Sequence, residues 1–453
     1  MNIERYQTYK YSEVKWLGDI PEHWETCVVK RVAKVGHKNF VDGEWIESPY
    51  ITDQGIRLIQ TGNVGIGIYK EKGGRYISEK TFNDFNCTEI FPNDVLVCRL
   101  DGPVGRACLV PDLQARMITS VDNTILKPSK DFDSKFIVYV MSSSLWLEWT
   151  QALCRVGGGF RFRISRSMLG ELRIQKPPLS EQEAIAHYLD TKTAQIDHKI
   201  DLLTQKVTLY SNLKQSLINE TVTHGLDKSV PMKDSGIEWL GEIPEYWKAR
   251  RLKDIFTYTK GYAFKSDDFI NSGTPVVKAT DIKQYRVLES TSFLESSVIE
   301  SYKNVLLKNN DIVITTVGSQ PNIVDSAVGQ LARIDEKTAG SLLNQNTLIL
   351  RITTKRISSE FLYYILISNF FRQHLDLIAR GTANQSSIKV SETLEYLFFL
   401  PSFEEQKTIA DYLDTKTTQI DQIIQTINTQ IEKLKELRKT LINDVVTGKI
   451  KVV

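Results

Sequence analysis

Two short segments of this chain carry side chains that could read nucleic-acid bases. The first, Gly157–Arg163, is a run of three glycines followed by alternating phenylalanine and arginine. The second, Gly381–Ser387, occupies the matching place in the second half of the chain and is rich in asparagine, glutamine and serine. Arginine pairs with guanine in the major groove or binds phosphate, whereas asparagine and glutamine prefer adenine. The alternative is a pair of solvated loops. We predict base contacts from Arg161, Arg163, Asn384 and Gln385.

A second pair of matching segments also carries side chains that could contact bases. Arg99–Arg106 follows an expected strand and begins and ends with arginine. Its counterpart in the second half of the chain carries small polar side chains, including Gln320 and Asn322. We therefore predict further base contacts from Arg99, Arg106, Gln320 and Asn322.

Sequence motifs for catalysis are missing. Gly62–Gly67 superficially resembles a nucleotide-binding loop, but it does not fit G-x-G-x-x-G and no Gly-Lys-Ser/Thr follows, so its glycines are assigned to turns. No H-E-x-x-H, G-x-S-x-G or Asn-Pro-Pro-aromatic pattern occurs. We therefore predict no catalytic residue and no metal site, although paired carboxylates can lie anywhere in a sequence.

These candidate segments belong to a duplicated chain. Trp16-Leu17-Gly18-Asp19-Ile20-Pro21-Glu22-His23-Trp24 returns in the second half as Trp239-Leu240-Gly241-Glu242-Ile243-Pro244-Glu245-Tyr246-Trp247. Tyr188–Thr193 returns at nearly the same offset as Tyr412–Thr417. Two copies of one unit predict an internal pseudo-dimer, whose natural target is also bipartite. The shared tryptophans are interpreted as anchors that tie the chain onto each fold, in preference to base stacking.

Composition sets further bounds on the class of protein. The chain has 453 residues, 41% of them hydrophobic, a mean hydropathy of −0.24 and a net charge of +2. No apolar run is long enough for a transmembrane helix, and the first residues do not form a signal peptide. All five cysteines lie in the first copy, so disulfides are not expected to hold the fold together. We expect a cytoplasmic protein of the α+β class.

Each copy is predicted to contain a globular part followed by one long helix. Matching strands are expected at 94–97 and 311–314 and at 123–126 and 346–349, and a helical stretch at 136–153 and 359–378. Ser180 with Glu183, and Ser402 with Glu405, predict capping boxes at the starts of the long helices, and Gly225 and Gly448 fit their ends. The expected boundaries are 1–177 for the first globular part, 178–225 for its helix, 226–400 for the second globular part, and 401–448 for the second helix before a tail to 453.

Apolar residues repeat with a period of seven along both long helices. This is the seam of a coiled coil, and Lys214 and Arg438 interrupt it at equivalent positions that can fix its register. We expect the helices to pair antiparallel, with packing of each helix on its own globular part as the alternative. At ~1.5 Å per residue the seam from 189 to 217 spans ~42 Å, comparable to one turn of B-DNA. The predicted seam consists of Leu189, Ile196, Leu203 and Leu217 in the first helix and Leu413, Ile420, Ile427, Leu434 and Leu441 in the second.

The combined motifs resemble those of a known family. The W-L-G-E-I-P-E-x-W segments and the E-Q-x-x-I-A-x-Y-L-D segments that begin at Glu181 and Glu405 resemble the specificity subunit of type I restriction-modification complexes. The resemblance implies two mixed α/β target-recognition domains in a pseudo-two-fold tandem repeat, separated by two long antiparallel coiled-coil helices. It implies that each domain reads one half of a split double-stranded DNA site, while the helices set the spacer.

The same resemblance implies partners and places the chemistry on them. Two methyltransferase subunits would dock on this chain and two restriction subunits would complete the complex. S-adenosylmethionine, ATP and magnesium would be bound by those subunits and not by this non-catalytic chain. A protein–protein scaffold with duplicated binding heads, and a fused nuclease with a hidden metal site, remain alternatives.

Overall fold

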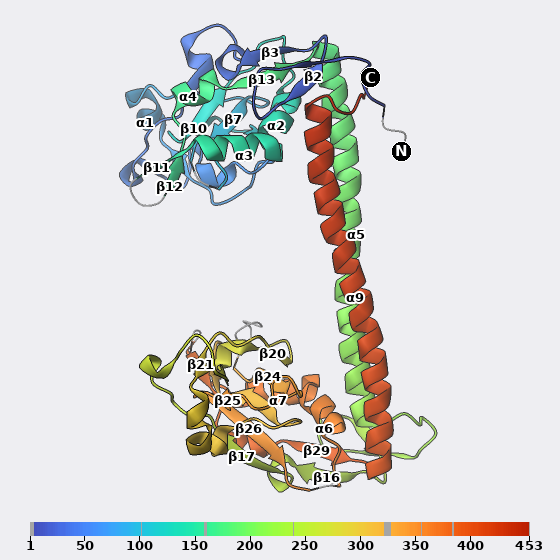
Figure 1. The fold of residues 1–453 in the computed structure, drawn as a ribbon. Helices are drawn as coiled ribbons and strands as arrows, with labels where there is room; N and C mark the ends of the chain where they lie inside the picture. The colour runs from blue at the N-terminus through green and yellow to red at the C-terminus, as the bar shows by residue number, and fades with distance from the viewer. Residues whose placement is uncertain are drawn as a thin grey trace. The chain divides into compact units, whose positions relative to one another are not determined.

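The computed structural model describes residues 4–100, 102–157, 161–238, 240–320, 328–354, 356–382 and 385–452 (Figure 1). The chain forms two compact units. The first unit combines residues 1–204 with 428–453, and the second consists of residues 205–427. Each unit therefore contains one globular head, the start of one long helix and the end of the other. The long helices are α5 (Leu179–His224) and α9 (Phe403–Val446).

The first head is an α+β domain built on two small sheets. An antiparallel sheet has the order β4-β10-β7-β8, and a three-stranded sheet, β6-β5-β9, pairs β5 parallel to β9. Its elements are β1 (Tyr9–Tyr11), β2 (Asp19–Pro21), β3 (Glu25–Val28), β4 (Phe40–Asp42), β5 (Ile56–Ile59), β6 (Tyr76–Ile77), α1 (Glu79–Asp84), β7 (Val95–Cys98), β8 (Ala107–Leu109), β9 (Met117–Thr119), β10 (Asn123–Leu126), α2 (Ser134–Ser142), α3 (Ser144–Leu153), β11 (Arg155–Gly157), β12 (Arg161–Arg163), α4 (Arg166–Glu171) and β13 (Arg173–Lys176).

The second head repeats the topology of these two sheets. The sheet β17-β26-β22-β24 corresponds to β4-β10-β7-β8, and β21-β18-β25 corresponds to β6-β5-β9. Its elements are β14 (Met232–Asp234), β15 (Glu242–Pro244), β16 (Lys248–Arg251), β17 (Phe256–Lys260), β18 (Thr274–Val277), β19 (Ile282–Lys283), β20 (Arg286–Val287), β21 (Phe293–Leu294), β22 (Ile312–Thr315), β23 (Val317–Gly318), β24 (Leu331–Arg333), β25 (Leu342–Leu343), β26 (Thr347–Ile352), α6 (Ser359–Leu366), α7 (Asn369–Ile378), β27 (Arg380–Thr382), β28 (Gln385–Ser387), α8 (Val390–Leu394) and β29 (Leu397–Leu400).

Two local predictions need correction. Each expected helical stretch is two helices, because Ser143 and Ser368 are extended and each caps the following helix with its hydroxyl. The capping box at Ser180 is wrong: α5 already begins at Leu179, and Pro178 accepts the first helical bonds. At the start of α9, by contrast, the Ser402 hydroxyl accepts a hydrogen bond from the Glu405 amide at 3.2 Å.

The core of each unit takes side chains from both long helices. In the first unit, Leu189 of α5 and Val445 of α9 are fully buried with Trp24 and Phe136. In the second unit, Val222 of α5 and Leu413 of α9 join Trp247 in the same way. The ends of the predicted seam are therefore part of the head cores, so both the pairing and the packing interpretations hold in part.

Within each unit the two long helices pair along the predicted seam. Ile420 and Ile427 are buried, and Ile196, Leu203, Leu217, Leu434 and Leu441 are half-buried. In the first unit, Arg438 Nε lies 2.8 Å from Asp197 Oδ1, and in the second, Lys214 Nζ lies 2.6 Å from Asp421 Oδ2. These ion pairs are equivalent under the internal repeat. The two basic residues predicted in the seam thus fix the same antiparallel register twice.

A carboxylate at the start of each long helix anchors the tryptophan motif of its head. Glu181 accepts hydrogen bonds from Tyr6 Oη at 2.9 Å and Trp24 Nε1 at 2.9 Å, and contacts His23 Nε2 at 2.6 Å. In the second unit, Glu405 accepts from Tyr246 Oη at 2.9 Å and Trp247 Nε1 at 3.3 Å. The shared motif therefore holds each head to its helix, as the anchor interpretation predicted for the tryptophans that the structure describes.

The far end of each helix is held by an equivalent asparagine. Asn443 Oδ1 accepts from the Ser144 amide at 3.0 Å in the first unit, and Asn219 Oδ1 accepts from the Asn369 amide at 2.9 Å in the second. Gly448 packs against Trp24, and Gly225 against Trp247, both with positive φ. Each head is thus fastened to two helix ends by repeated contacts.

Glu181→Ala is expected to destabilise the first unit by about 2 kcal/mol, because the buried Trp24 indole loses its acceptor. Burial alone would raise the pKa of Glu181, but the bonds from Trp24, His23 and Tyr6 outweigh it and lower the pKa below 4.5. A lowered folded pKa gives stability that is complete above pH 4.5 and is lost as the pH falls through the folded value. Urea unfolding at pH 7 should therefore show a lower free energy of unfolding for Glu181→Ala than for the unmodified chain. Below pH 4.5 this difference in the free energy of unfolding should shrink. Glu183→Ala, at an exposed position of the same helix turn, is the control, and an equal effect of both variants would contradict the anchor.

Candidate nucleic-acid interface

The glycine–arginine segment of the first head and its counterpart form the same β-hairpin. In the first head, β11 pairs antiparallel with β12, with Arg155 opposite Arg163. In the second head, β27 pairs with β28, with Arg380 opposite Ser387. The tips, residues 158–160 and 383–384, lie outside the described residues.

In each head, this hairpin is hydrogen-bonded to the second segment predicted to contact DNA, which is Arg99–Arg106 in the first head and its counterpart at 316–320 in the second. In the first head, Leu100 forms a β-bridge with Arg163, and the Ile164 amide donates to the Arg99 carbonyl at 3.0 Å. In the second head, β23 pairs with β28, and the Ile388 amide donates to the Thr316 carbonyl at 3.0 Å. The structure therefore brings together, within each head, two segments that lie far apart in the sequence.

Arg99 and Arg106 lie inside the first head, 3% and 6% exposed, and not on its surface as expected for base contacts. Arg99 forms an ion pair with Asp42 at 3.0 Å and donates to the Val121 carbonyl. Arg106 donates to the carbonyls of Val64, Thr61, Leu100 and Pro103. Because their guanidinium groups bind the chain's own carbonyls, we assign both arginines the role of positioning the surrounding loops.

Arg163 is one of the predicted side chains that the described part of the chain leaves accessible to a ligand. Its side chain is 53% exposed, and its Nη2 lies 2.8 Å from Asp122 Oδ1. Gln385 is exposed on β28, and Gln320 is half-buried. Arg161 lies on β12, but its side chain, like all of Asn322 and Asn384, is outside the described part of the chain.

Sequence reasoning missed a polar cleft of about 370 Å³ beside the Arg163 hairpin. Asp122 and Leu100 line it next to the hairpin, and Trp45, 65% exposed, lies at the same cleft. Burial raises the pKa of Glu44 above its usual value, while Lys38 opposes the shift. Arg99 donates to the Val121 carbonyl and Arg106 to the Thr61 carbonyl, so the two arginines hold two walls of this cleft in place. The lining comprises Glu44, Trp45, Ile46, Gln60, Thr61, Gly62, Asn63, Lys72, Leu100, Ser120, Val121 and Asp122.

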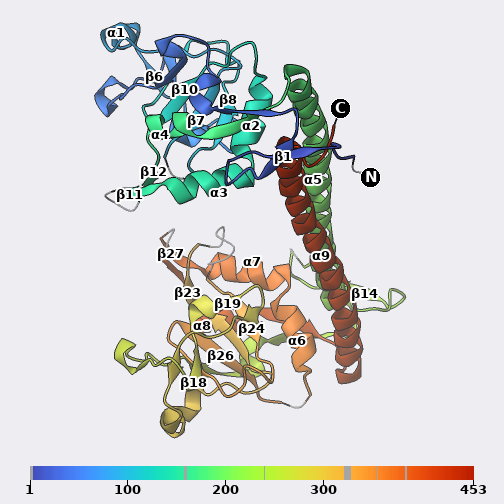
Figure 2. The ribbon, with the colours of Figure 1, turned by 45° about the horizontal axis from the view of Figure 1, so that its top comes forward.

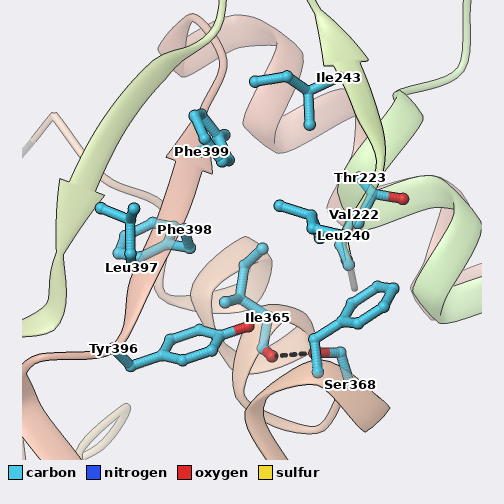
Figure 3. A pocket seen from close by; sticks show the side chains of 11 residues that line it. Val222, Thr223, Leu240, Ile243, Ile365, Ser368, Tyr396, Leu397, Phe398 and Phe399 are labelled. Carbon is cyan, nitrogen blue, oxygen red and sulfur yellow. Dashed lines mark hydrogen bonds between the residues drawn. The ribbon is translucent and has the colours of Figure 1, made fainter. Parts of the chain in front are cut away.

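A second cavity, in the second unit, is apolar and small (Figure 3). It has a volume of about 10 Å³, close to that of one water molecule. Val222 from the end of α5 lines it together with Ile365 and Phe398, and the Ser368 hydroxyl donates to the Ile365 carbonyl at 2.7 Å. This is a packing gap between helix and head, too small for an organic ligand.

Within the described ranges, no group of three or more histidine, cysteine, aspartate or glutamate side chains is arranged to hold a metal ion. All five cysteines are free thiols. Among the helices that the structure describes, none combines the length and apolar character needed to cross a membrane.

Comparison with known proteins covers both halves of the chain. The family model for the type I restriction modification DNA specificity domain matches residues 21–206 and again 244–433. The MjaVIII specificity subunit of Methanocaldococcus jannaschii is 28% identical over 64% of this chain and 64% of that protein. The MjaIX specificity subunit of the same organism is 23% identical over 96% and 95%. The EcoKI specificity subunit of Escherichia coli is 21% identical over 96% and 90%. The matches to MjaVIII and to a putative MjaX subunit span only 64% and 47% of those relatives' lengths.

Solved structures share the fold. A chain from a structure of the type I R-M system has a TM-score of 0.71 at 14% identity, covering 94% of this chain and 98% of that one. The HsdS subunit from Thermoanaerobacter tengcongensis has a TM-score of 0.52 at 15% identity, covering 95% and 98%. The repeated heads, the paired long helices and the two family matches agree, and the chain belongs to the type I restriction modification DNA specificity family.

Proposed function

We propose that this chain is the DNA specificity subunit of a type I restriction-modification complex. Each head reads one half of a split double-stranded DNA site, and α5 and α9 set the spacer between the halves. One observation carries this proposal: both heads place the same β-hairpin against the same loop, but with different side chains on it. A shared framework with different hydrogen-bonding groups suits two different half-sites.

The first head offers a charged contact and the second head a neutral one. Arg163 on β12 can bind guanine or phosphate, whereas Gln385 on β28 suits adenine. The carboxylates of Glu44 and Asp122 at the polar cleft are acceptors for base amino groups, as cytosine presents in the major groove. Arg99 and Arg106 support these groups from inside the head.

Membership of the family supports a proposal about partners and cofactors. We propose that two methyltransferase subunits and two restriction subunits assemble with this chain in the cytoplasm. Those subunits would bind S-adenosylmethionine, ATP and magnesium. This chain would supply recognition, positioning and docking surfaces.

Arg163→Ala is expected to weaken binding of the methyltransferase complex to its DNA site about 10- to 100-fold, because one charge-assisted contact is lost. If Arg163 contacts a base, the variant should lose sequence preference in one half-site only. If Arg163 contacts a phosphate, affinity should fall equally for all sequences, and the slope of log affinity against log salt concentration should be smaller by about one. Fluorescence anisotropy against the intact site and against each half-site exchanged separates these results.

Arg116→Ala is the matched control, since Arg116 is also an exposed, ion-paired arginine of the first head. Binding should change less than twofold in that variant. Equal DNA affinities of the Arg163→Ala and Arg116→Ala complexes would show that Arg163 does not contact the DNA. A complex that binds all duplexes equally would instead support a protein–protein scaffold.

A further inference from the structure

The two heads share one further hairpin in position but not in chemistry. In the second head, β19 and β20 pair Ile282 with Val287 and Lys283 with Arg286. In the first head, Val64 forms the equivalent bridge with Tyr69, at the corresponding place in the repeat.

Both hairpins follow a short helical turn with the same cap. In the first head, Asn63 Oδ1 accepts from the Gln60 amide at 2.9 Å. In the second head, Asp281 Oδ2 accepts from the Lys278 amide at 2.9 Å. The scaffold beneath the two tips is therefore equivalent, and differences at the tips are head-specific.

The side chains at the two tips differ completely. The first head has Gly65-Ile66-Gly67-Ile68, in which no side chain can form a hydrogen bond. The second head has Lys283-Gln284-Tyr285-Arg286, and Gln284, Tyr285 and Arg286 are exposed. Lysine and arginine bind phosphate, glutamine pairs with adenine, and tyrosine packs against bases.

The backbone of the second tip is held in a conformation that its side chains disfavour. Gln284 and Tyr285 have φ values of 50° and 63°, as a type I′ turn requires, although asparagine followed by glycine is the preferred pair there. The Tyr363 hydroxyl donates to the Tyr285 carbonyl at 3.1 Å, so α6 holds the tip while the Tyr285 side chain stays 43% exposed. Backbone strain of this kind clusters at functional sites.

Helix α7 lies between this region and the proposed DNA-reading hairpin in a chain of contacts. Burial raises the pKa of the Tyr285 hydroxyl, and the nearby positive charge of Arg372 on α7 opposes that rise. Arg372 Nη1 donates to the Val328 carbonyl at 2.8 Å. The Val328 amide donates to the Ser319 carbonyl at 2.9 Å, directly after β23, which pairs with β28. Figure 2 shows β19 near β23 and α7 in the second head.

We propose that Lys283–Arg286 is a DNA-contacting tip of the second head that has no polar counterpart in the first. Lys283 and Arg286 bind phosphates, and Gln284 and Tyr285 contact bases of the half-site that the second head reads. This inference rests on the proposed function and adds a recognition element to it.

The test uses the full complex with its methyltransferase subunits and a duplex carrying the split site identified by mapping its methylation. The double variant Q284N/Y285G installs the preferred type I′ pair, so folding is preserved and the melting temperature should stay equal or rise. Affinity for the site should fall at least tenfold. Ile66→Asn, at the equivalent tip of the first head, is the control and should bind within twofold of the unmodified complex.

Exchanged half-sites complete the test. When the half-site of the second head is scrambled, the unmodified complex and Q284N/Y285G should bind with equal affinity. If Q284N/Y285G and the unmodified complex bind the intact site with equal affinity, this inference is overturned but the proposed function is not. An unmodified complex without preference for any split site would overturn the proposed function as well.

Discussion

Removing one heptad from each long helix is expected to shorten the preferred DNA spacer by about three base pairs while both half-site sequences are kept. Seven residues correspond to ~10 Å of helix, and B-DNA rises ~3.4 Å per base pair. Three base pairs also turn the duplex by roughly a third of a turn, so affinity for the original spacing should fall by about 100-fold.

The helix pairing dictates which residues to remove. Residues 202–208 of α5 and 427–433 of α9 lie between the Asp197–Arg438 and Lys214–Asp421 ion pairs. Deleting both segments keeps the seam in phase and leaves both ion pairs in place. Binding to duplexes with spacers of graded length measures the result. A full-length control with Leu203→Met and Ile427→Leu should keep the original spacer, and an unchanged spacer in the shortened protein would reject the helices as the determinant.

Gly43→Ala is expected to cost the first head about 3 kcal/mol or more, because the methyl group would overlap the Thr119 carbonyl oxygen and leave 2.5 Å to that of Ser120. Neither atom can move freely, since Thr119 belongs to β9 and its carbonyl accepts from the Glu44 amide at 3.0 Å. Gly261, at the matching position of the second head, makes the equivalent approach to Asn344. Urea unfolding followed by tryptophan fluorescence should show an earlier transition in Gly43→Ala.

Gly62→Ala provides the matched control in the same head. Gly62 has an ordinary φ, and an added methyl group meets nothing within 4 Å. Its stability should stay within about 0.5 kcal/mol of the unmodified chain. A Gly43→Ala protein as stable as Gly62→Ala would show that the loop after β4 can move away from β9.

Much of the architecture could be predicted because the two halves of the duplicated chain can be compared with each other. The heptad repeats predicted the long helices, and Lys214 and Arg438 predicted a fixed register that both ion pairs confirm. Local capping was less predictable. Ser180 has the right spacing to Glu183, but the chain enters α5 earlier, at Pro178.

The candidate site was predicted only in part, because exposure depends on contacts distant in sequence. Arg99 and Arg163 have the same side chain, yet Asp42 and the Val121 carbonyl draw Arg99 inside. The cleft at Trp45 forms where segments that are distant in the sequence meet, from Glu44 to Asp122. The glycines of Gly62–Gly67 were assigned to turns, and only the paired bridges of the two heads revealed that Lys283–Arg286 is the counterpart of Gly65–Ile68.

Mapping methylated adenines in cells that express this chain with the methyltransferase subunits proposed as its partners tests the central claim most directly. The account predicts one split motif, with two defined halves and a gap of constant length. Exchanging the second head for another should then alter one half alone. A continuous motif, or methylation without sequence preference, would contradict the assignment of one half-site to each head.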